Sequence, residues 1–226
     1  MKNLSFLTRC LILFFWPFIA HAAATALAVN GDVRVSTPRV VGGPLAVGQR
    51  IDSGATLTTA ANAGTTLRFD DGQMIAVAGS STYVIDDYRF NPHKPEEGGF
   101  ISTLVKGGIR SVSGLIGQLN AKQVEVRTQT ATIGIRGTDF DLFFDGKLYI
   151  VVQRGAIAAI NDAGEGVFAA DGQAIGLVLN RQTRARVAAL AEFPAEAQAA
   201  FRQLDDNPEL GAKARNPSDP SCSDRR

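Results

Sequence analysis

Short runs of alternating apolar and polar residues extend over most of the chain, and Gly, Asp and Asn residues separate them. Between residues 29 and 179 these runs lack the spacing of an amphipathic helix. Such alternation is typical of half-buried strands, and frequent turn residues between the runs are typical of antiparallel sheets. We therefore expect an all-β domain, with its clearest strands at residues 33–35, 65–69, 74–77, 83–85, 124–127, 140–143 and 148–152.

Three Asp-Gly pairs predict β-hairpins, and the alternation of side chains selects their register. A three-residue loop at residues 144–146 places Phe140 beside Ile150 and keeps the apolar residues on one face. A two-residue turn would mix the faces, because a slip by one residue moves every side chain across the sheet. The same register around residues 70–72 and 170–172 places Leu67 beside Ile75 and Val167 beside Ile175. Repeated hairpins predict either a solenoid-like β-roll or a sandwich of short antiparallel strands.

The N-terminal segment departs from this β pattern. Lys2 and Arg9 precede an apolar run at residues 11–20, which leads into the small-x-small sequence Ala20-His21-Ala22. These three parts define a secretory signal peptide, so we expect residues 1–22 to be removed and the protein to be periplasmic or extracellular. Retention of the segment as a membrane anchor is the alternative. No other segment has the roughly 20 apolar residues that span a bilayer, so the mature chain is expected to have no integral membrane span.

The C-terminal region also has a different character. Residues 181–206 are rich in Ala, Arg, Glu and Gln, and four apolar residues share one helical face: Phe193, Ala197, Phe201 and Leu204. We expect one or two helices here that cap an end of the β domain, which itself spans residues 23–180. The Pro-containing segment 207–226 is expected to be disordered.

Composition excludes several functional classes. The chain is 45% hydrophobic and 20% charged, which indicates a globular protein, and its formal net charge of +1 gives no field that attracts nucleic acid. After the signal peptide the chain keeps one histidine, His93, in a Pro-punctuated loop, and one cysteine, Cys222. A catalytic triad needs an oriented histidine, and zinc needs several Cys or His ligands. We therefore expect no catalytic residue, no metal and no cofactor.

Aspartates and tyrosines suggest weaker alternatives. Asp70-Asp71, Asp86-Asp87, Asp139, Asp141 and Asp145 could ligate calcium or serve a hydrolase, but turn positions account for most of them and the sequence has no 12-residue calcium loop. A glycan site would need exposed aromatic faces. The mature chain has no Trp, and Tyr83 and Tyr149 are expected to be half-buried in strands.

One short run breaks the alternation. Apolar positions are odd-numbered at Ile133 and Ile135 but even-numbered at Phe140 and Leu142, so the phase reverses at Arg136-Gly137. A β-bulge inserts one residue and reverses the alternation, and Gly commonly occupies it. In the structural interpretation Arg136 binds carbonyls, Asp139 or Asp141. In the functional one it is an anchor for a carboxylate or a partner chain.

The segment 131–140, Ala-Thr-Ile-Gly-Ile-Arg-Gly-Thr-Asp-Phe, resembles the signature of the FecR-domain family. Residues 47–55, 67–72, 104–110 and 151–157 resemble its other motifs, so the resemblance covers roughly residues 45–160. It implies an all-β, non-enzymatic extracytoplasmic domain. The best-known relatives are iron-siderophore signalling regulators with a cytoplasmic anti-sigma segment before a membrane span. No such segment precedes the apolar run here, so contact with a sigma factor is not expected.

These observations lead to one functional hypothesis and one alternative. We expect an exported interaction module of the bacterial cell envelope, a signalling or scaffold protein that binds another envelope protein. Its candidate interaction residues are Arg136, Gly137, Thr138 and Asp139. The alternative is a binding module for an envelope glycan or another small ligand, and a hydrolase ranks third.

Overall fold

The computed structural model describes residues 22–210, apart from residues 39 and 173. The expected signal peptide, except for its last residue, and residues 211–226 of the expected tail lie outside the described residues. In chain order the strands are β1 (Ala22–Asn30), β2 (Val33–Thr37), β3 (Val40–Pro44), β4 (Arg50–Asp52), β5 (Thr56–Thr59), β6 (Gly64–Phe69), β7 (Met74–Val77), β8 (Thr82–Arg89), β9 (Gly99–Val112), β10 (Val124–Arg127), β11 (Thr132–Phe144), β12 (Leu148–Asn161), β13 (Gly164–Ala169), β14 (Ile175–Val178) and β15 (Arg186–Val187). The helices are α1 (Leu115–Leu119) and α2 (Ala195–Asp205), with 3₁₀ turns η1 (Pro95–Glu97), η2 (Ala121–Gln123) and η3 (Leu190–Glu192).

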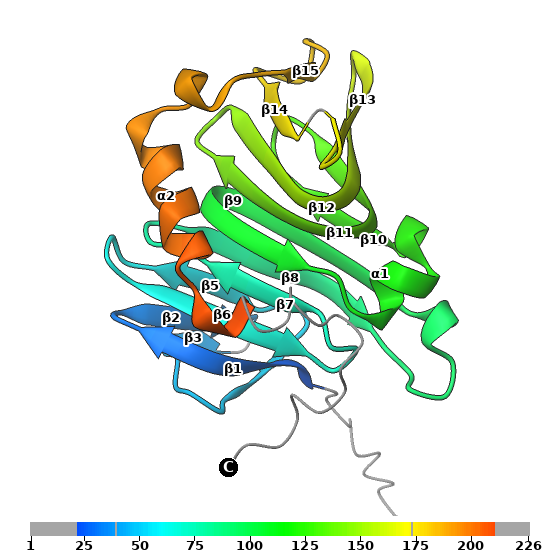
Figure 1. The fold of residues 1–226 in the computed structure, drawn as a ribbon. Helices are drawn as coiled ribbons and strands as arrows, with labels where there is room; N and C mark the ends of the chain where they lie inside the picture. Colours follow the sequence, from blue (N-terminus) through cyan, green and yellow to red (C-terminus); the bar gives the residue numbers. More distant parts are fainter. Residues whose placement is uncertain (1–21, 39, 173, 211–226) are drawn as a thin grey trace, which may run out of the picture.

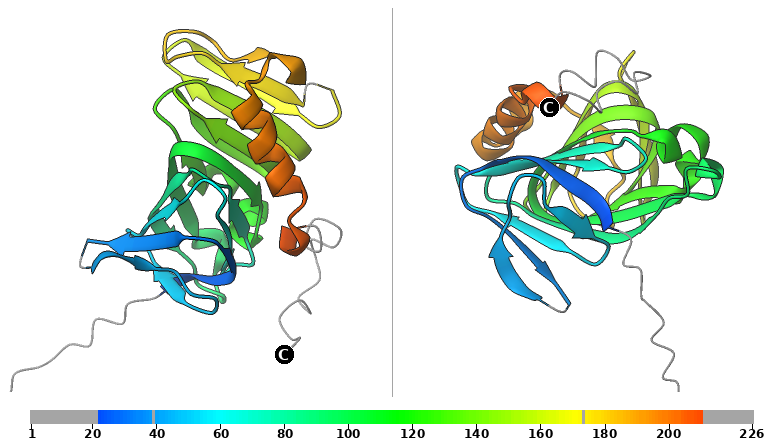
Figure 2. Two further views of the ribbon diagram at one scale, coloured as in Figure 1. Left: turned by 90° about the vertical axis from the view of Figure 1, so that its left-hand side faces the viewer. Right: turned by 90° about the horizontal axis from the view of Figure 1, so that it is seen from below.

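The 15 strands form one continuous sheet that folds over on itself (Figures 1 and 2). The sheet bends along its three longest strands, β9, β11 and β12, because each of them has different neighbours along its two halves. The first half of β9 pairs with β8 and β10, whereas its second half pairs with β7 and β11. The first half of β12 pairs with β14 and its second half with β13. These pairings divide the sheet into two layers.

The two layers share their long strands. The first layer contains β4, β1, β6, β7, the second halves of β9 and β11, the first half of β12, β14 and β15. The second layer contains β3, β2, β5, β8, the first halves of β9 and β11, β10, the second half of β12 and β13. The crossings lie at glycines with positive φ, namely Gly107 (+85°), Gly137 (+58°) and Gly155 (+73°). The expectation of a β-roll or sandwich with a short C-terminal helix is confirmed.

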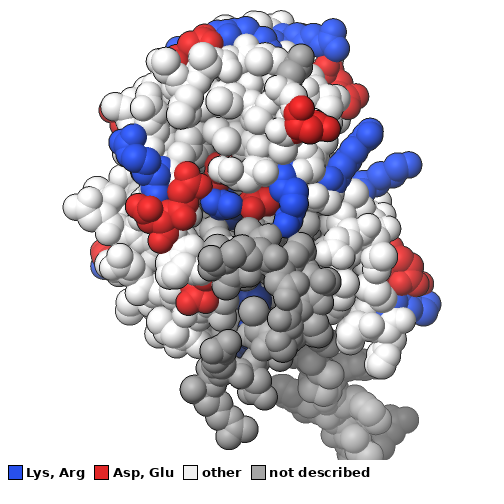
Figure 3. Space-filling model, in the orientation of Figure 1, with Lys and Arg blue, Asp and Glu red and all other residues white. Residues whose placement is uncertain are grey.

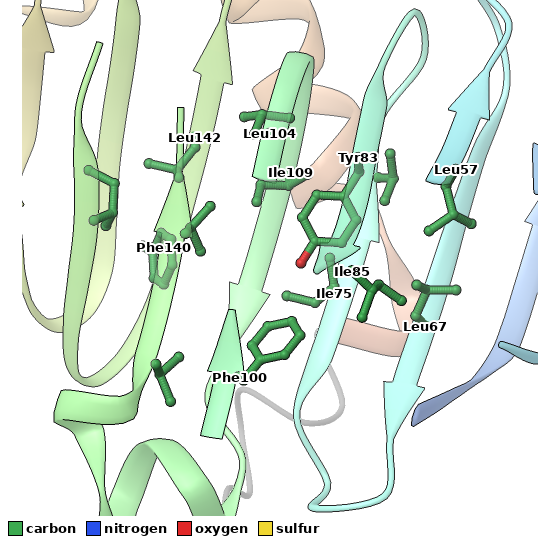
Figure 4. Close-up of a cluster of buried hydrophobic side chains, with 14 of the residues drawn as sticks. Leu57, Leu67, Ile75, Tyr83, Ile85, Phe100, Leu104, Ile109, Phe140 and Leu142 are labelled. Atoms are coloured by element: carbon green, nitrogen blue, oxygen red, sulfur yellow. The ribbon is translucent and has the colours of Figure 1, made fainter. Parts of the chain in front are cut away.

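The main core lies between the layers. Ile109, Phe140 and Leu142 from the first layer meet Tyr83 and Leu104 from the second, and all five are fully buried (Figure 4). Helix α1 closes one end of this core by inserting Ile116. Tyr83 is therefore completely enclosed, not half-buried as expected.

A second apolar cluster lies outside the roll, where α2 covers the outer face of the first layer. The four residues predicted to share a helical face, Phe193, Ala197, Phe201 and Leu204, are all buried there. The helix thus lies across a face (Figure 2), and not at an end as expected. It is also shorter than the predicted segment 181–206, because residues 186–187 add strand β15 to the sheet. The packed chain extends into the expected tail, since Leu210 is buried and Asn207 Nδ2 donates to Thr66 Oγ1 at 2.8 Å.

The hairpin predictions had three different outcomes. The register around residues 70–72 is confirmed, with Leu67 opposite Ile75. At the second hairpin the loop is residues 145–147 instead of 144–146, and Phe140 lies opposite Val152, which keeps the predicted faces. The third prediction is wrong. Strands β13 and β14 do not pair with each other, because each pairs with a different half of the bent strand β12.

Candidate interaction site

The four candidate residues lie at the crossing of β11 from the second layer to the first. The register of β11 against β12 shifts between Arg136 and Asp139, and Gly137 has a φ of +58°. Ile135 before the shift and Phe140 after it both enter the core. The bulge predicted from the reversed alternation is therefore present.

Thr138 fastens the bulge to the end of β9. Its backbone N–H donates to Ser113 Oγ at 3.1 Å, and its carbonyl accepts the Ser113 backbone N–H at 3.0 Å. Both side chains are buried. Thr138 and Ser113 therefore have a structural role in holding the crossing.

Asp139 is held by an arginine that the sequence analysis did not single out. Arg110 of β9 donates from Nε to Asp139 Oδ1 at 2.9 Å and from Nη2 to Oδ2 at 3.0 Å. The third guanidinium nitrogen, Nη1, lies 2.8 Å from Asp205 Oδ1 of α2. A forked guanidinium suits such bidentate binding, and here one side chain joins two strands and a helix.

Asp141 is the most deeply buried carboxyl of this cluster. Gln153 Nε2 donates to its Oδ2 at 2.8 Å, while Arg110 Nε is 3.9 Å from its Oδ1. Burial raises the pKa of Asp141 to about 7, and the negative charges of Asp205 and Asp139 act in the same direction. Burial also raises the pKa of Asp205, against the effect of Arg110.

The cluster thus places three carboxyl groups around one guanidinium. Figure 3 shows a band of mixed acidic and basic side chains across this face of the molecule. Sequence reasoning missed Arg110 because its pairing depends on the register of β9 against β11, which places it opposite Asp141. The alternation along β9 does indicate the direction of Arg110. Because Ile109 points into the core, the next side chain, Arg110, must point outward.

Arg136 has a different environment from the other three residues. Its side chain is exposed, and the described residues provide no ion pair for it. The structural role that the sequence suggested for Arg136, a bond to Asp139 or Asp141, belongs to Arg110 instead. Of the four candidates, Arg136 is the one with an exposed, charged side chain.

Other candidate chemistry gains little support from the structure. Tyr149 is buried like Tyr83, so neither offers a stacking face for a sugar. Over the described ranges, no group of three or more His, Cys, Asp and Glu residues is arranged to hold a metal ion. A search of the same residues found no helix with the length and apolar character of a membrane span.

A groove of about 750 Å³ opens at one end of the roll, beside the first turns of α2. Its lining includes the apolar residues Val105, Phe143 and Phe144 and the charged residues Lys106 and Glu196. Such a size is compatible with a small ligand.

Comparison with known proteins identifies a family for part of this all-β chain. The family model described as FecR protein matches residues 55–158, and this part of the chain is a FecR domain. The FecR family is regulatory and non-catalytic. No curated protein matches the chain.

Two crystal structures of a proposed anti-sigma factor from Parabacteroides distasonis are similar to the chain. Their sequence identities are 11% and 12%, and their TM-scores are 0.44 and 0.45. In both comparisons the match covers 58% of this chain and 57% of the other, so the chain spans little more than half of that protein.

Proposed function

We propose that this protein is an exported, non-enzymatic FecR-like module of the bacterial cell envelope, which signals or scaffolds by binding another envelope protein. One observation carries the proposal: the fold uses Gly137, Thr138 and Asp139 internally, whereas Arg136 projects from the same bulge without an ion pair among the described residues. A bulge re-aims a side chain, and Arg is enriched at the centres of protein interfaces.

The expected export and the regulatory character of the family support this proposal. The charged start, apolar run and small-x-small site of residues 1–22 are typical of a secretory signal peptide. Regulatory proteins without catalytic groups act through their binding partners. Arg136 is suited to bind a carboxylate of such a partner, because a guanidinium donates two parallel hydrogen bonds to it.

The test is cross-linking capture from intact cells that make the full-length chain with a C-terminal tag. We expect one envelope protein to be recovered with the wild type and with Arg34→Glu, an exposed charge reversal on β2 that serves as the control. We expect Arg136→Glu to reduce its recovery at least tenfold. N-terminal sequencing should find a chain that starts near Ala23. Equal recovery with Arg136→Glu would contradict the role of Arg136, and a retained Met1 would contradict cleavage.

The groove supports a second candidate function, the binding of an envelope glycan or another small ligand. Substitution Val105→Trp would place a bulky indole in the lining of the groove, and Val47→Trp places the same side chain at an exposed position outside that lining. The second function predicts that the protein binds purified peptidoglycan and that only Val105→Trp abolishes this binding. Absence of binding by the wild type would remove peptidoglycan as the ligand.

A further inference from the structure

The outer faces of the two layers are covered differently. Helix α2 lies on the first layer so closely that a Cβ added to Gly108 would be 3.1 Å from Ala200 Cβ. A Cβ added to Gly134 of the second layer would meet no atom within 4 Å. Gly134 points outward because its neighbours Ile133 and Ile135 enter the core. No atom of the described residues therefore lies directly above Gly134.

We propose that this open face around Gly134 and Arg136 is the docking surface for an amphipathic helix of the partner protein, bound in the way α2 binds the first layer. The inference rests on the proposed function and specifies the element that the partner contributes.

The chain itself shows how this sheet binds a helix. On the first layer, small residues such as Gly108 and Ala78 receive Ala200 of α2, which allows a close approach of the two backbones. Apolar side chains of α2 bury the flanks. At the end of the helix, Asp205 pairs with Arg110 of the sheet at 2.8 Å. The binding pattern thus has three parts: small residues at the centre of the contact, apolar side chains at its flanks, and one arginine of the sheet that pairs with a carboxylate of the helix.

The second layer repeats this pattern, and within residues 22–210, as far as they are described, no element occupies it. The strand register places Gly134 opposite Ala158, and Ala158 opposite Val167. Val167 and Ile160 are 53% and 47% exposed at the flank of this small-residue centre. Arg136 lies at one end, opposite Ala156. Exposed apolar residues beside an unused arginine are typical of protein interfaces.

The charges specify the helix further. Glu125, the neighbour of Gly134 on β10, is neutralised by Arg127 at 2.8 Å. Arg136 therefore favours a carboxylate on the partner. Glu165 lies opposite Ile160 at the far edge and favours a cation there. Four residues along β12 and two strand spacings separate these ends, roughly 16 Å, so the two partner charges should be about three helical turns apart.

Addition of a partner strand to the free edge of β13 fits the structure less well. Among the described strands, β13 pairs only with β12, but Arg184 Nε donates to the Glu165 carbonyl at 2.9 Å. Arg184, Ala185 and Val187 also line the shallow pocket beside that edge. An arginine side chain thus already occupies an acceptor that an added strand would use, and side-chain cover of this kind protects sheet edges.

The test places a photo-cross-linking amino acid at Ala158 of the full-length protein in its native cells, and at Val47 as the control position. We expect Ala158 to cross-link to a helical, acidic segment of the envelope partner. Arg136→Glu should reduce this product at least tenfold, and replacement of the contacted partner carboxylate by lysine should restore it. Gly134→Leu, whose Cβ would meet no atom within 4 Å in the fold, should keep the melting temperature and reduce the product at least tenfold.

Several outcomes would overturn the inference. Cross-links from Ala158 to another copy of this chain, to its own tail or to a strand of the partner would each reject a partner helix. A partner captured at Val47 but not at Ala158 would leave the proposed function in place and reject this surface. No partner at either position, together with none in the capture experiment, would reject both.

Discussion

Arg110 and Asp139 form a bidentate ion pair between β9 and β11, directly after the bulge at Gly137. Their side chains are only 12% and 4% exposed. The same guanidinium reaches Asp205 of α2, so one arginine connects the crossing of the sheet to its helical cover. The neighbouring Arg136 is exposed and takes no part in this arrangement. The two arginines therefore have separable roles.

The first prediction concerns these two arginines. Arg110→Ala should lower the free energy of unfolding by about 3–5 kcal/mol, because it leaves the buried carboxylate of Asp139 without its partner. Arg136→Ala should change it by less than about 0.5 kcal/mol, as expected for an exposed side chain. Urea unfolding at pH 7.5 measures both. A larger loss for Arg136→Ala than for Arg110→Ala would reverse the assignment of structural and binding roles.

The second prediction concerns the pH dependence that Asp141 imposes. Burial raises the pKa of Asp141 from 3.8 to about 7 in the folded protein, so between these values the folded state binds a proton that the unfolded state has lost. Stability must therefore fall as the pH rises from about 4 to 7, by an amount on the order of 4 kcal/mol at most. Asp141→Asn removes this dependence.

Urea unfolding at pH 5, 6, 7 and 8 tests this behaviour. The stability of Asp141→Asn relative to the wild type should increase steadily across the series and level off above pH 7. Asp32→Asn, at an exposed position, provides the control and should show no such trend. A relative stability of Asp141→Asn that stays constant from pH 5 to 8 would show instead that Asp141 is already ionised in the folded protein throughout this range.

Local patterns predicted the features that depend on neighbouring residues. The reversal of alternation at Arg136-Gly137 located the bulge, and helical spacing identified the face of α2 that contains Phe193 and Leu204. The bulge and the buried helix face both follow from the spacing of the apolar side chains that are removed from water. This spacing is visible in a segment of about ten residues.

Features that depend on distant strands were not predicted. The Arg110–Asp139 pair requires the register of β9 against β11, across 29 positions of sequence. The false hairpin between β13 and β14 arose because turn chemistry alone cannot show that β12 crosses between layers at Gly155. The open face around Gly134 was missed for the same reason, since its neighbours come from three other strands.

The third prediction concerns the close approach of two strands where the sheet crosses between layers. A Cβ at Gly155 would lie 2.5 Å from the carbonyl oxygen of Gly137, and the φ of Gly155 is +73°. Gly155→Ala should therefore destabilise the fold by more than about 3 kcal/mol, through steric overlap and backbone strain together. Gly146 also has a positive φ, +100°, but a Cβ there would meet nothing within 4 Å.

Gly146→Ala is thus the matched control and should cost only about 1–2 kcal/mol of strain. Thermal unfolding of both variants gives the comparison. If the two losses were equal, the contact between Gly155 and Gly137 would contribute nothing beyond the backbone conformation.

The last prediction concerns α2 as an integral part of the fold. Leu204 is 1% exposed in the cluster between α2 and the first layer, so Leu204→Ala should cost about 2–5 kcal/mol through lost burial and the cavity it leaves. Leu190, just before the helix, is 46% exposed, and Leu190→Ala should have an effect below about 0.5 kcal/mol. Hydrogen exchange should also show that Leu204→Ala increases exchange in α2 and in β7 beneath it. Unchanged stability would mean that α2 is a detachable cover, in which case the first layer could expose a second helix-binding face.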